Sequence, residues 1–434
     1  MSNVENRLPA SNSASADGGK TVVVASNGPC AGVDFGPGNS ASGTNGFLEA
    51  LRSGAAKVVV RGAFTVTAPT NLGSNVHLEF DDATLTLGGS VNMFQAGGQS
   101  NLTFSGTVRF AGGRSAGFAG FGFLLNGCSN VLFDWTCQVS DFASSPGKFL
   151  INCNPQGPTG GRNLTLRGRT VTLDSTVIRT NDWSQVDVSG VHTAPGGLTA
   201  VVPLALVAVM SDGAAGSTGG VSVHDCQMDG GGIQKVSGLV RVFGAPGAGN
   251  IAGVKCANLQ LRNSIPVPSA GLADGLDINH CVDVQVSAVT GDRCCDLVSC
   301  VASRAVVSDC VAQDCNGVGI LVGDGGSQTE SIADITVRNC VATNCGRGLK
   351  FVNAAGLGVA SSRGTTTDRV TFENCRSHDT TGSAQMFGFG FNPVGSITNV
   401  KIVGGELSGF SQPVANAPRS GLQVRGVAGA SDSG

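Results

Sequence analysis

The feature that most constrains the fold of this chain is a short recurring segment: a polar turn residue, an apolar residue, any residue, and a second apolar residue. Its copies are Asn75–Leu78, Asn101–Phe104, Asn130–Phe133, Asn163–Leu166, Asn258–Leu261, Asp283–Val286, Asp334–Val337, Arg369–Phe372 and Asn399–Ile402. Apolar residues at alternate positions predict a short strand with one buried face. A second apolar segment precedes many copies, as at Phe123–Leu125 and Leu276–Ile278. Each unit therefore holds at least two strands and no segment of helical period.

The closest internal match fixes the type of repeat. Asp309–Cys315 and Asn339–Cys345 are nearly identical and lie 30 residues apart, a period typical of solenoids. Such a unit buries its apolar face only when each strand stacks on its equivalent ~4.8 Å away, which gives parallel sheets. We therefore expect an all-β solenoid with Cys310, Cys340 and Cys375 in one buried column. The stretch 182–220 fits the repeat worst and is expected to be a large excursion.

Composition excludes several classes of protein. The 434 residues carry a net charge of −3 with no basic cluster, so no nucleic-acid partner is expected. The longest apolar candidate, Leu198–Met210, contains Pro203 and is shorter than the ~18–20 residues of a membrane-spanning helix. Residues 1–20 show no basic segment followed by an apolar one, so no secretory signal is predicted. The 15 cysteines and 5 scattered histidines indicate buried thiols rather than a zinc site, and no metal or cofactor is expected.

A family resemblance begins at residues 46–88. A helix-like segment at Gly46–Leu51 is followed by Leu72–Leu78, with the letters LGSNVHL, and by Ala83–Leu85. This series resembles the entry coil of pectin-lyase-like proteins. The resemblance implies a single-stranded right-handed parallel β-helix of about ten coils, closed at its N-terminal end by a capping helix that covers the open sheet edge. We expect a polar segment at 1–45, the β-helix at 46–422 and a flexible tail at 423–434.

Within that superfamily, the later part of the chain resembles the polygalacturonase-like glycoside hydrolases. Their motifs NTDGID, GDD, GHG and RIK are matched by Leu272–Asp277, Gly291–Arg293, Cys315–Gly317 and Gly348–Lys350. The resemblance implies Asp274 and Asp292 as catalytic residues, and it implies four substrate-binding residues: Arg293, Asn316, Arg347 and Lys350. Arg293 replaces the second Asp of the pair, Asn316 replaces the His, and the interval from Asp274 to Asp292 is shorter than is usual in the family.

These departures bear on the mechanism. Hydrolysis of a glycosidic bond needs one protonated carboxyl group and one carboxylate that activates water. Asp292 matches the acid and Asp274 the base. An arginine at 293 would lower the pKa of nearby carboxyl groups, which suits a base and opposes an acid. Asp277 and Asp296, each next to a strand residue, are candidates for the same outer groove.

Three functions stay open. The first is a carbohydrate-directed surface protein that binds an acidic or neutral polysaccharide, with glycosidic-bond hydrolysis as its activity; arginine would grip the carboxylate of a uronic-acid unit. The second is a non-catalytic structural or adhesive component of a virion or surface assembly, whose partners are other virion or surface proteins. In that case Asp274, Arg293, Asn316 and Arg347 are paired residues at coil corners. The third is a lyase, although no carboxylate cluster in the sequence indicates a calcium site. A virion-associated or released extracellular location is compatible with the first two functions.

Overall fold

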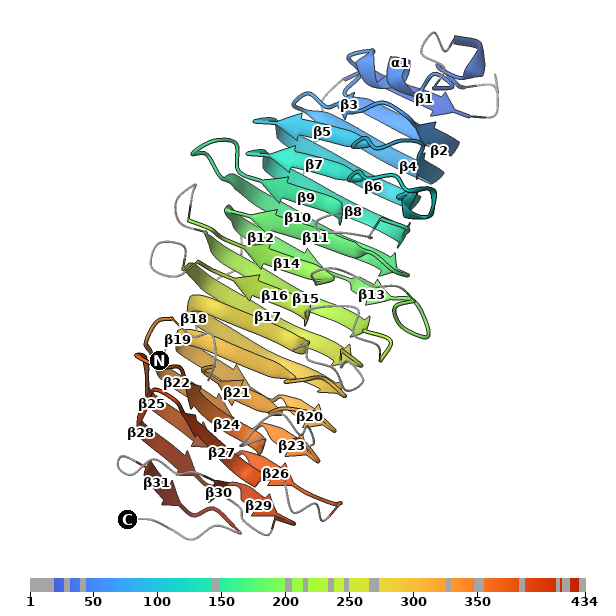
Figure 1. The fold of residues 1–434 in the computed structure, drawn as a ribbon. Helices are drawn as coiled ribbons and strands as arrows, with labels where there is room; N and C mark the ends of the chain where they lie inside the picture. The colour runs from blue at the N-terminus through green and yellow to red at the C-terminus, as the bar shows by residue number, and fades with distance from the viewer. Residues whose placement is uncertain are drawn as a thin grey trace.

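The fold is a stack of parallel strands wound around one axis (Figure 1). The computed structural model describes residues 19–26, 32–39, 44–142, 149–199, 205–213, 218–232, 238–245, 250–264, 273–324, 329–346, 355–381, 387–410, 414–415 and 422–428. Each strand pairs with the strand one coil before it and the strand one coil after it, as β6 does with β4 and β8. The chain is therefore a single-stranded right-handed parallel β-helix, as the repeat and the resemblance predict.

The elements from the N-terminal end are β1 (Thr21–Ala25), η1 (Pro37–Asn39), α1 (Phe47–Arg52), β2 (Lys57–Val66), β3 (Thr70–Asn71), β4 (Val76–Leu87), β5 (Phe94–Gly97), β6 (Ser100–Ala111), η2 (Arg114–Ala116), β7 (Phe123–Asn126), β8 (Ser129–Ser140), β9 (Phe149–Asn154), β10 (Gly161–Thr172), β11 (Thr176–Asn181), β12 (Trp183–Ser189), β13 (Val191–Thr193), β14 (Val207–Met210) and β15 (Gly219–Asp229). The remaining elements are β16 (Gly238–Phe243), β17 (Ile251–Arg262), β18 (Asp274–Asp292), β19 (Val298–Ser308), β20 (Val311–Gln313), β21 (Ile320–Val322), β22 (Ile332–Arg338), β23 (Val341–Thr343), β24 (Ala355–Ser361), β25 (Thr366–Glu373), β26 (Arg376–His378), β27 (Phe387–Pro393), β28 (Ser396–Val403), β29 (Glu406–Ser408), β30 (Val414–Ala415) and β31 (Leu422–Arg425).

The strands form three walls, and β18 contributes to all of them. Residues 274–279 of β18 belong to the first wall, which also contains β5, β7, β9, β11, β14 and β16. Residues 284–287 belong to the second wall and 289–292 to the third. Positions with positive φ, including Asp283 and Ala288, bend the chain between walls.

The polar residue that leads the repeat stands at one corner of every coil, just before the second wall. The register places twelve such residues in one column: Asn75, Asn101, Asn130, Asn163, Gln185, Gly220, Gly253, Asp283, Arg304, Asp334, Arg369 and Asn399. Their φ angles lie between 51° and 67°, in the left-handed region that Gly, Asn and Asp tolerate best. The described part of the helix therefore has more turns than the expected ten or so.

Asn258 also leads a copy of the repeat, but the register assigns it to a different corner. It stacks between Asp225 and Ala288, before the third wall, while Gly253 occupies the first corner of that coil.

The described parts of 182–220 are not an excursion. They supply β12, β13 and β14, which pair with both neighbouring coils, so this prediction is wrong.

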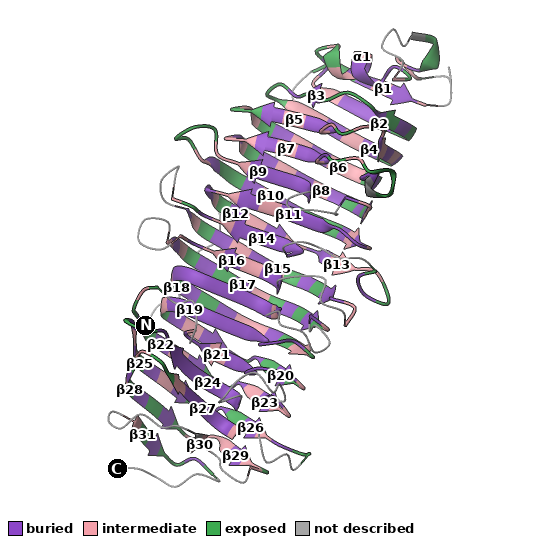
Figure 2. Cartoon of the chain, in the orientation of Figure 1, coloured by how far each residue is buried: buried purple, intermediate pink, exposed green. Residues whose placement is uncertain are grey.

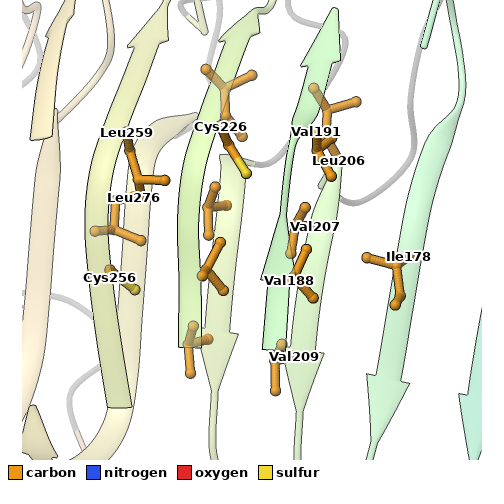
Figure 3. Packing of buried hydrophobic residues seen from close by; sticks show 14 of the residues in the cluster. Ile178, Val188, Val191, Leu206, Val207, Val209, Cys226, Cys256, Leu259 and Leu276 are labelled. Atoms are coloured by element: carbon orange, nitrogen blue, oxygen red, sulfur yellow. The ribbon is translucent and has the colours of Figure 1, made fainter. Parts of the chain in front are cut away.

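The interior is filled by alternate side chains from all three walls. Figure 2 shows buried residues along nearly every strand, and Figure 3 shows Ile178, Val207 and Leu276 among such residues in the middle coils. The N-terminal coils carry stacked aromatic rings, with the Phe104 and Phe133 centroids 4.7 Å apart. Further along, Cys310, Cys340 and Cys375 stack in successive coils as the sequence predicts, and all three are buried free thiols.

The N-terminal end of the ladder carries α1 (Figure 1). Its Phe47 is buried, and the Phe47 ring lies 5.1 Å from the ring of Phe64, so the helix packs on the end of the core. Upstream of α1, β1 pairs with β2, so the ladder begins before the predicted boundary at residue 46. At the other end, β31 crosses the predicted boundary at 422. Among the described residues, no helix combines the length and the hydrophobicity needed to cross a bilayer.

Candidate acidic site on the first wall

Asp274 is the first residue of the first-wall segment of β18, and the structure brings it against Asp296 of the next coil. Leu276 pairs with Val298, which places Asp296 directly beside Asp274. The backbone N–H of Asp296 donates to Asp274 Oδ1 at 3.2 Å, and Gly275 N–H donates to the Asp296 carbonyl at 2.8 Å. The partner of Asp274 across coils is therefore Asp296.

Asp292, the predicted second catalytic residue, lies elsewhere. It belongs to the third wall, where it stacks between Arg262 and Gln313, and it forms an ion pair of 2.7 Å with its neighbour Arg293. Arg293 itself is the residue with φ 51° that bends the chain after the third wall. No hydrogen bond or ion pair joins Asp292 or Arg293 to Asp274 within the described residues. The structure does not bring the predicted pair together, because the chain runs four residues beyond Asp292 before it reaches the position beside Asp274.

Asp296 is held by the coil that follows it. Its side chain is buried, and its Oδ1 accepts the backbone N–H of Val318 at 2.5 Å. Gly317 makes this approach possible, because a Cβ there would lie 2.2 Å from Asp296 Oδ1. The adjacent Asn316 donates its backbone N–H to the Cys294 carbonyl at 2.9 Å, so this predicted binding residue does lie in the turn next to the site.

Asp277 points outward from the first wall and pairs with Arg241 of the preceding coil. Arg241 Nε lies 2.8 Å from Asp277 Oδ2, and both side chains are largely buried. The Arg241 guanidinium also lies 5.0 Å from the centroid of the Phe243 ring. Two residues along the same face, the Oδ1 of Asn279 is buried without a hydrogen-bond partner among the described residues.

Burial gives these carboxyl groups unusual acidities. Desolvation raises the pKa of Asp274 well above its usual range, and the nearby Asp296 and Asp277 raise it further. Burial raises the pKa of Asp296 to about 7, against the opposing effect of the Val318 N–H. Burial also raises the pKa of Asp277, although Arg241 counteracts it. Asp274 and Asp296 are therefore adjacent acids that both hold a proton to a higher pH than an ordinary aspartate does.

Cys295 completes the cluster. Its Sγ and one oxygen each of Asp274 and Asp296 lie within 4.8 Å of one another. Such a set could contact a metal ion, but a thiol binds a metal only as the thiolate, and burial beside the two acids raises the pKa of Cys295. The three groups therefore suit an acid–base site better than a metal site. Cys294 and Cys295 are both buried, because the chain bends at Arg293.

The register also revises the motif match. The pair stacked next to Asp274 is Cys295 and Asp296, so the two acids of the GDD pattern correspond to a cysteine and one aspartate. The sequence signal for this was the short interval from Asp274 to Asp292. Arg241 had no signal in the motifs, since it belongs to the preceding coil. Arg347 and Lys350, the other predicted binding residues, lie outside the described residues.

Comparison with known proteins supports the fold. No family model matches the chain, and no curated protein matches it. Among solved structures, the Dettilon tailspike protein is similar at a TM-score of 0.50 and 11% identity, over 93% of this chain and 70% of the tailspike. Tailspike protein 3 of bacteriophage CBA120 matches at a TM-score of 0.48 and 12% identity over 91% of this chain, which spans 60% of that protein's length. An exopolygalacturonase from Thermotoga maritima matches at a TM-score of 0.46 and 11% identity, over 82% of this chain and 86% of the enzyme.

The strand ladder and the match to the Dettilon tailspike protein define the class of architecture: the chain has a parallel β-helix fold. At these identities the likeness concerns the fold alone, and the activity has to be argued from the site.

Proposed function

We propose that the protein binds a polysaccharide across the outer face of the first wall and cleaves a glycosidic bond at the Asp274–Asp296 pair. The observation that carries this proposal is a pair of adjacent acids on one wall, both with raised pKa values. Groups with strongly shifted pKa values and a specific charge partner are typical of acid–base catalysis. Exopolygalacturonase and alginate epimerase are among the proteins that share the fold, which agrees with a polysaccharide ligand.

The two carboxyl groups take different roles because they differ in exposure. Asp274 is the more exposed of the two and its pKa is raised well above the usual range, so it donates a proton to the glycosidic oxygen as the bond breaks. Asp296 is fixed by the Val318 N–H and is the base or nucleophile on the sugar. Their oxygens lie within 4.8 Å of each other, nearer the ~5–5.5 Å separation of retaining glycosidases than the ~6.5–9.5 Å of inverting ones. We expect the product to retain its anomeric configuration.

Substrate binding falls to the groups around this pair. The unpartnered Asn279 Oδ1 would accept a sugar hydroxyl, and Asn316 lies in the turn beside Asp296. Arg241, stacked against Phe243, offers a cation for the carboxylate of a uronic-acid unit. Arg293, Arg347 and Lys350 stay in the proposal only as binding residues that the sequence predicts, since Arg293 lies at the corner after the third wall and the other two fall outside the described residues.

The test is reducing-end release from a panel of uronic-acid and neutral polysaccharides. We expect the unaltered chain to release reducing ends from at least one member. Asp274→Asn and Asp296→Asn should each lower that rate by about 100-fold, since a positioned acid or base contributes ~10²–10⁴. Asp309→Asn, at an exposed corner on the third wall, is the matched control and should change nothing. Equal rates in Asp296→Asn and in the control would remove the proposal.

A second variant tests the same site in the opposite direction. Cys295→Asp would restore a carboxyl at the position where the motif has its first acid. We expect faster release of reducing ends, while Cys294→Ser, in the adjacent buried position, should not accelerate it. No gain in Cys295→Asp would argue that the surviving pair does not work in the manner of the polygalacturonase-like enzymes.

A non-catalytic role has its own support and forms the second proposal. The strand ladder runs without interruption through the described coils from β1 to β31, which suits a stiff rod. Tailspikes and a surface adhesin are among the proteins with similar folds. Under this proposal the chain occurs in a virion or surface assembly, and binding without reducing-end release would favour it over cleavage.

A further inference from the structure

A groove lies on the first wall, several coils before the acidic site. It has a volume of about 410 Å³ and is lined by the outer faces of β3, β5 and β7, with Asn71, Gln95, Gln99, Leu124 and Asn126 among its residues. In the first-wall column, Leu124 stands five strand steps from Asp277, about 24 Å at ~4.8 Å per step. We propose that this surface, the amide groove, binds a neutral oligosaccharide independently of the acidic site.

The lining determines the charge of the ligand. None of the residues that line the amide groove is charged, and four of them carry side-chain amides. A uronate or sulfated sugar would be desolvated there without a cation to compensate it. Amides offer both donors and acceptors, which match the hydroxyl groups of a neutral sugar.

The amides are already oriented. Gln95 Nε2 donates to Asn71 Oδ1 at 2.6 Å, Ser74 Oγ donates to Gln99 Oε1 at 2.8 Å, and Gln99 Nε2 donates to the Gly97 carbonyl at 3.0 Å. Each of these amide groups still has capacity for a further hydrogen bond. Because their side chains are held in place before a ligand arrives, binding costs less conformational entropy.

The same face continues beyond the groove with an unsatisfied acceptor. Leu124 pairs with Asn152 of the next coil, and both point outward. Asn152 is 3% exposed, and its Oδ1 has no hydrogen-bond partner among the described residues. An acceptor here gives an anion no compensating charge, which agrees with a neutral ligand. Leu124 supplies a small apolar contact between the amides, suited to the C–H face of a sugar ring.

The experiment measures binding of linear hexasaccharides of glucose, mannose and galactose to the full chain by isothermal titration calorimetry, with hexagalacturonate as the anionic comparison. We expect at least one neutral hexasaccharide to bind. The double variant Gln95→Ala, Asn126→Ala should weaken binding about tenfold or more, since each lost hydrogen bond contributes ~0.5–1.5 kcal/mol. Gln138→Ala, an exposed glutamine on the third wall, is the matched control.

Asp296→Asn separates this inference from the proposed cleavage. It should leave the affinity for the neutral hexasaccharide unchanged even if it abolishes reducing-end release. Side-chain amide signals of Gln95 and Asn126 in the unaltered chain should shift on titration, a readout that does not depend on how the variants fold. The inference is overturned if no neutral hexasaccharide binds, if binding survives the double variant, or if only hexagalacturonate shifts these amides.

Discussion

The first corner of the helix is built in two ways along its length. In the N-terminal coils it is an asparagine ladder: the side-chain amides of Asn101, Asn130 and Asn163 each donate to the asparagine of the preceding coil, at 2.8, 3.0 and 2.8 Å. In the C-terminal coils the same column alternates in charge. Arg304 contacts Asp283 at 2.7 and 2.9 Å, and Arg369 contacts Asp334 at 2.6 and 2.9 Å.

The difference shows which constraint is strict and which is not. Every member of the column has a positive φ, and asparagine adopts it readily while arginine rarely does. Arg304 and Arg369 are tolerated because each grips the aspartate of the preceding coil with two nitrogen atoms. The backbone geometry of the corner is fixed, and the contact that supports it is exchangeable.

The largest expected effect comes from breaking the asparagine ladder. In Asn130→Ala the backbone at φ 55° is occupied by alanine, which adopts a positive φ less readily than asparagine. The substitution also removes two side-chain amide hydrogen bonds. We expect a loss of about 2 kcal/mol in the free energy of unfolding, from backbone strain and lost hydrogen bonds. Asn130→Gly, which suits the φ angle, should lose only about half as much. Urea denaturation measures both, and equal losses would show that backbone strain is not involved.

Acid should separate the two ladders. The arginine partners lower the pKa of Asp283 and of Asp334 below the ordinary value. When the pKa of a carboxyl group is lower in the folded state than in the unfolded state, the group stabilises the fold at pH values above the unfolded pKa of ~3.9. This stabilisation is lost as the pH falls through the folded-state pKa. Hydrogen exchange should therefore accelerate first at the C-terminal corner below about pH 4. Simultaneous loss of protection at Asn101 and Asn130 would contradict the comparison.

A histidine between the two regions should respond to base instead. His224 lies 3.1 Å from Asp187 and 2.7 Å from Asp225, and these partners raise its pKa to about 9. A raised folded-state pKa contributes stability that is complete below the unfolded value of ~6.5 and is lost as the pH rises through about 9. The side chain is one-third exposed, so solvent reduces the effect. Thermal denaturation of His224→Gln should lack this alkaline decrease; an unchanged profile would assign it to another group.

Salt should have a smaller effect, confined to one region. Raising sodium chloride from about 0.05 to 1 M screens the exposed Asp–Arg pairs and leaves the amide contacts unaffected. Hydrogen exchange at the C-terminal corner should increase slightly, with the asparagine ladder as the internal control. A larger increase in hydrogen exchange at the asparagine ladder than at the C-terminal corner would contradict the prediction that salt weakens only the charged contacts.

The smallest change is expected from Arg369→Asn. It removes the ion pairs of Arg369 with Asp334 and Asp368, and it replaces an unfavourable residue at φ 51° with a favourable one. The two effects oppose each other, so the free energy of unfolding should change by less than a routine denaturation experiment resolves. A clear loss would mean that the charged contact dominates the backbone preference at this corner.

Much of the architecture could be predicted from the sequence, because the polar residue at the corner and the alternating apolar residues after it are local signals. The same local signal occurs at two corners, so the pattern alone does not show that Asn258 leads its copy at a different corner from the other copies. The site was harder to predict. Asp274 and its coil follow from the motif, but the partner across coils depends on how the turn at Arg293 is bent, and only the register of β18 and β19 identifies Asp296.

Arg241 illustrates a second limit. It contacts Asp277 through the ladder rather than through a motif, and a single sequence contains no pattern that joins the two. The amide groove has the same origin, since its members come from separate coils. Side chains that meet along the helix axis become predictable only when the length of every intervening turn is known.

The pairing of each strand with its neighbours one coil away has a consequence for biosynthesis. β25 needs only β22 to start pairing, just as β6 needs only β4. The molecule can therefore be laid down progressively while the ribosome is still at work, each finished coil serving as the template for the next. Truncation within the described ladder should leave a shorter rod with an open end, rather than a chain that has lost its structure throughout.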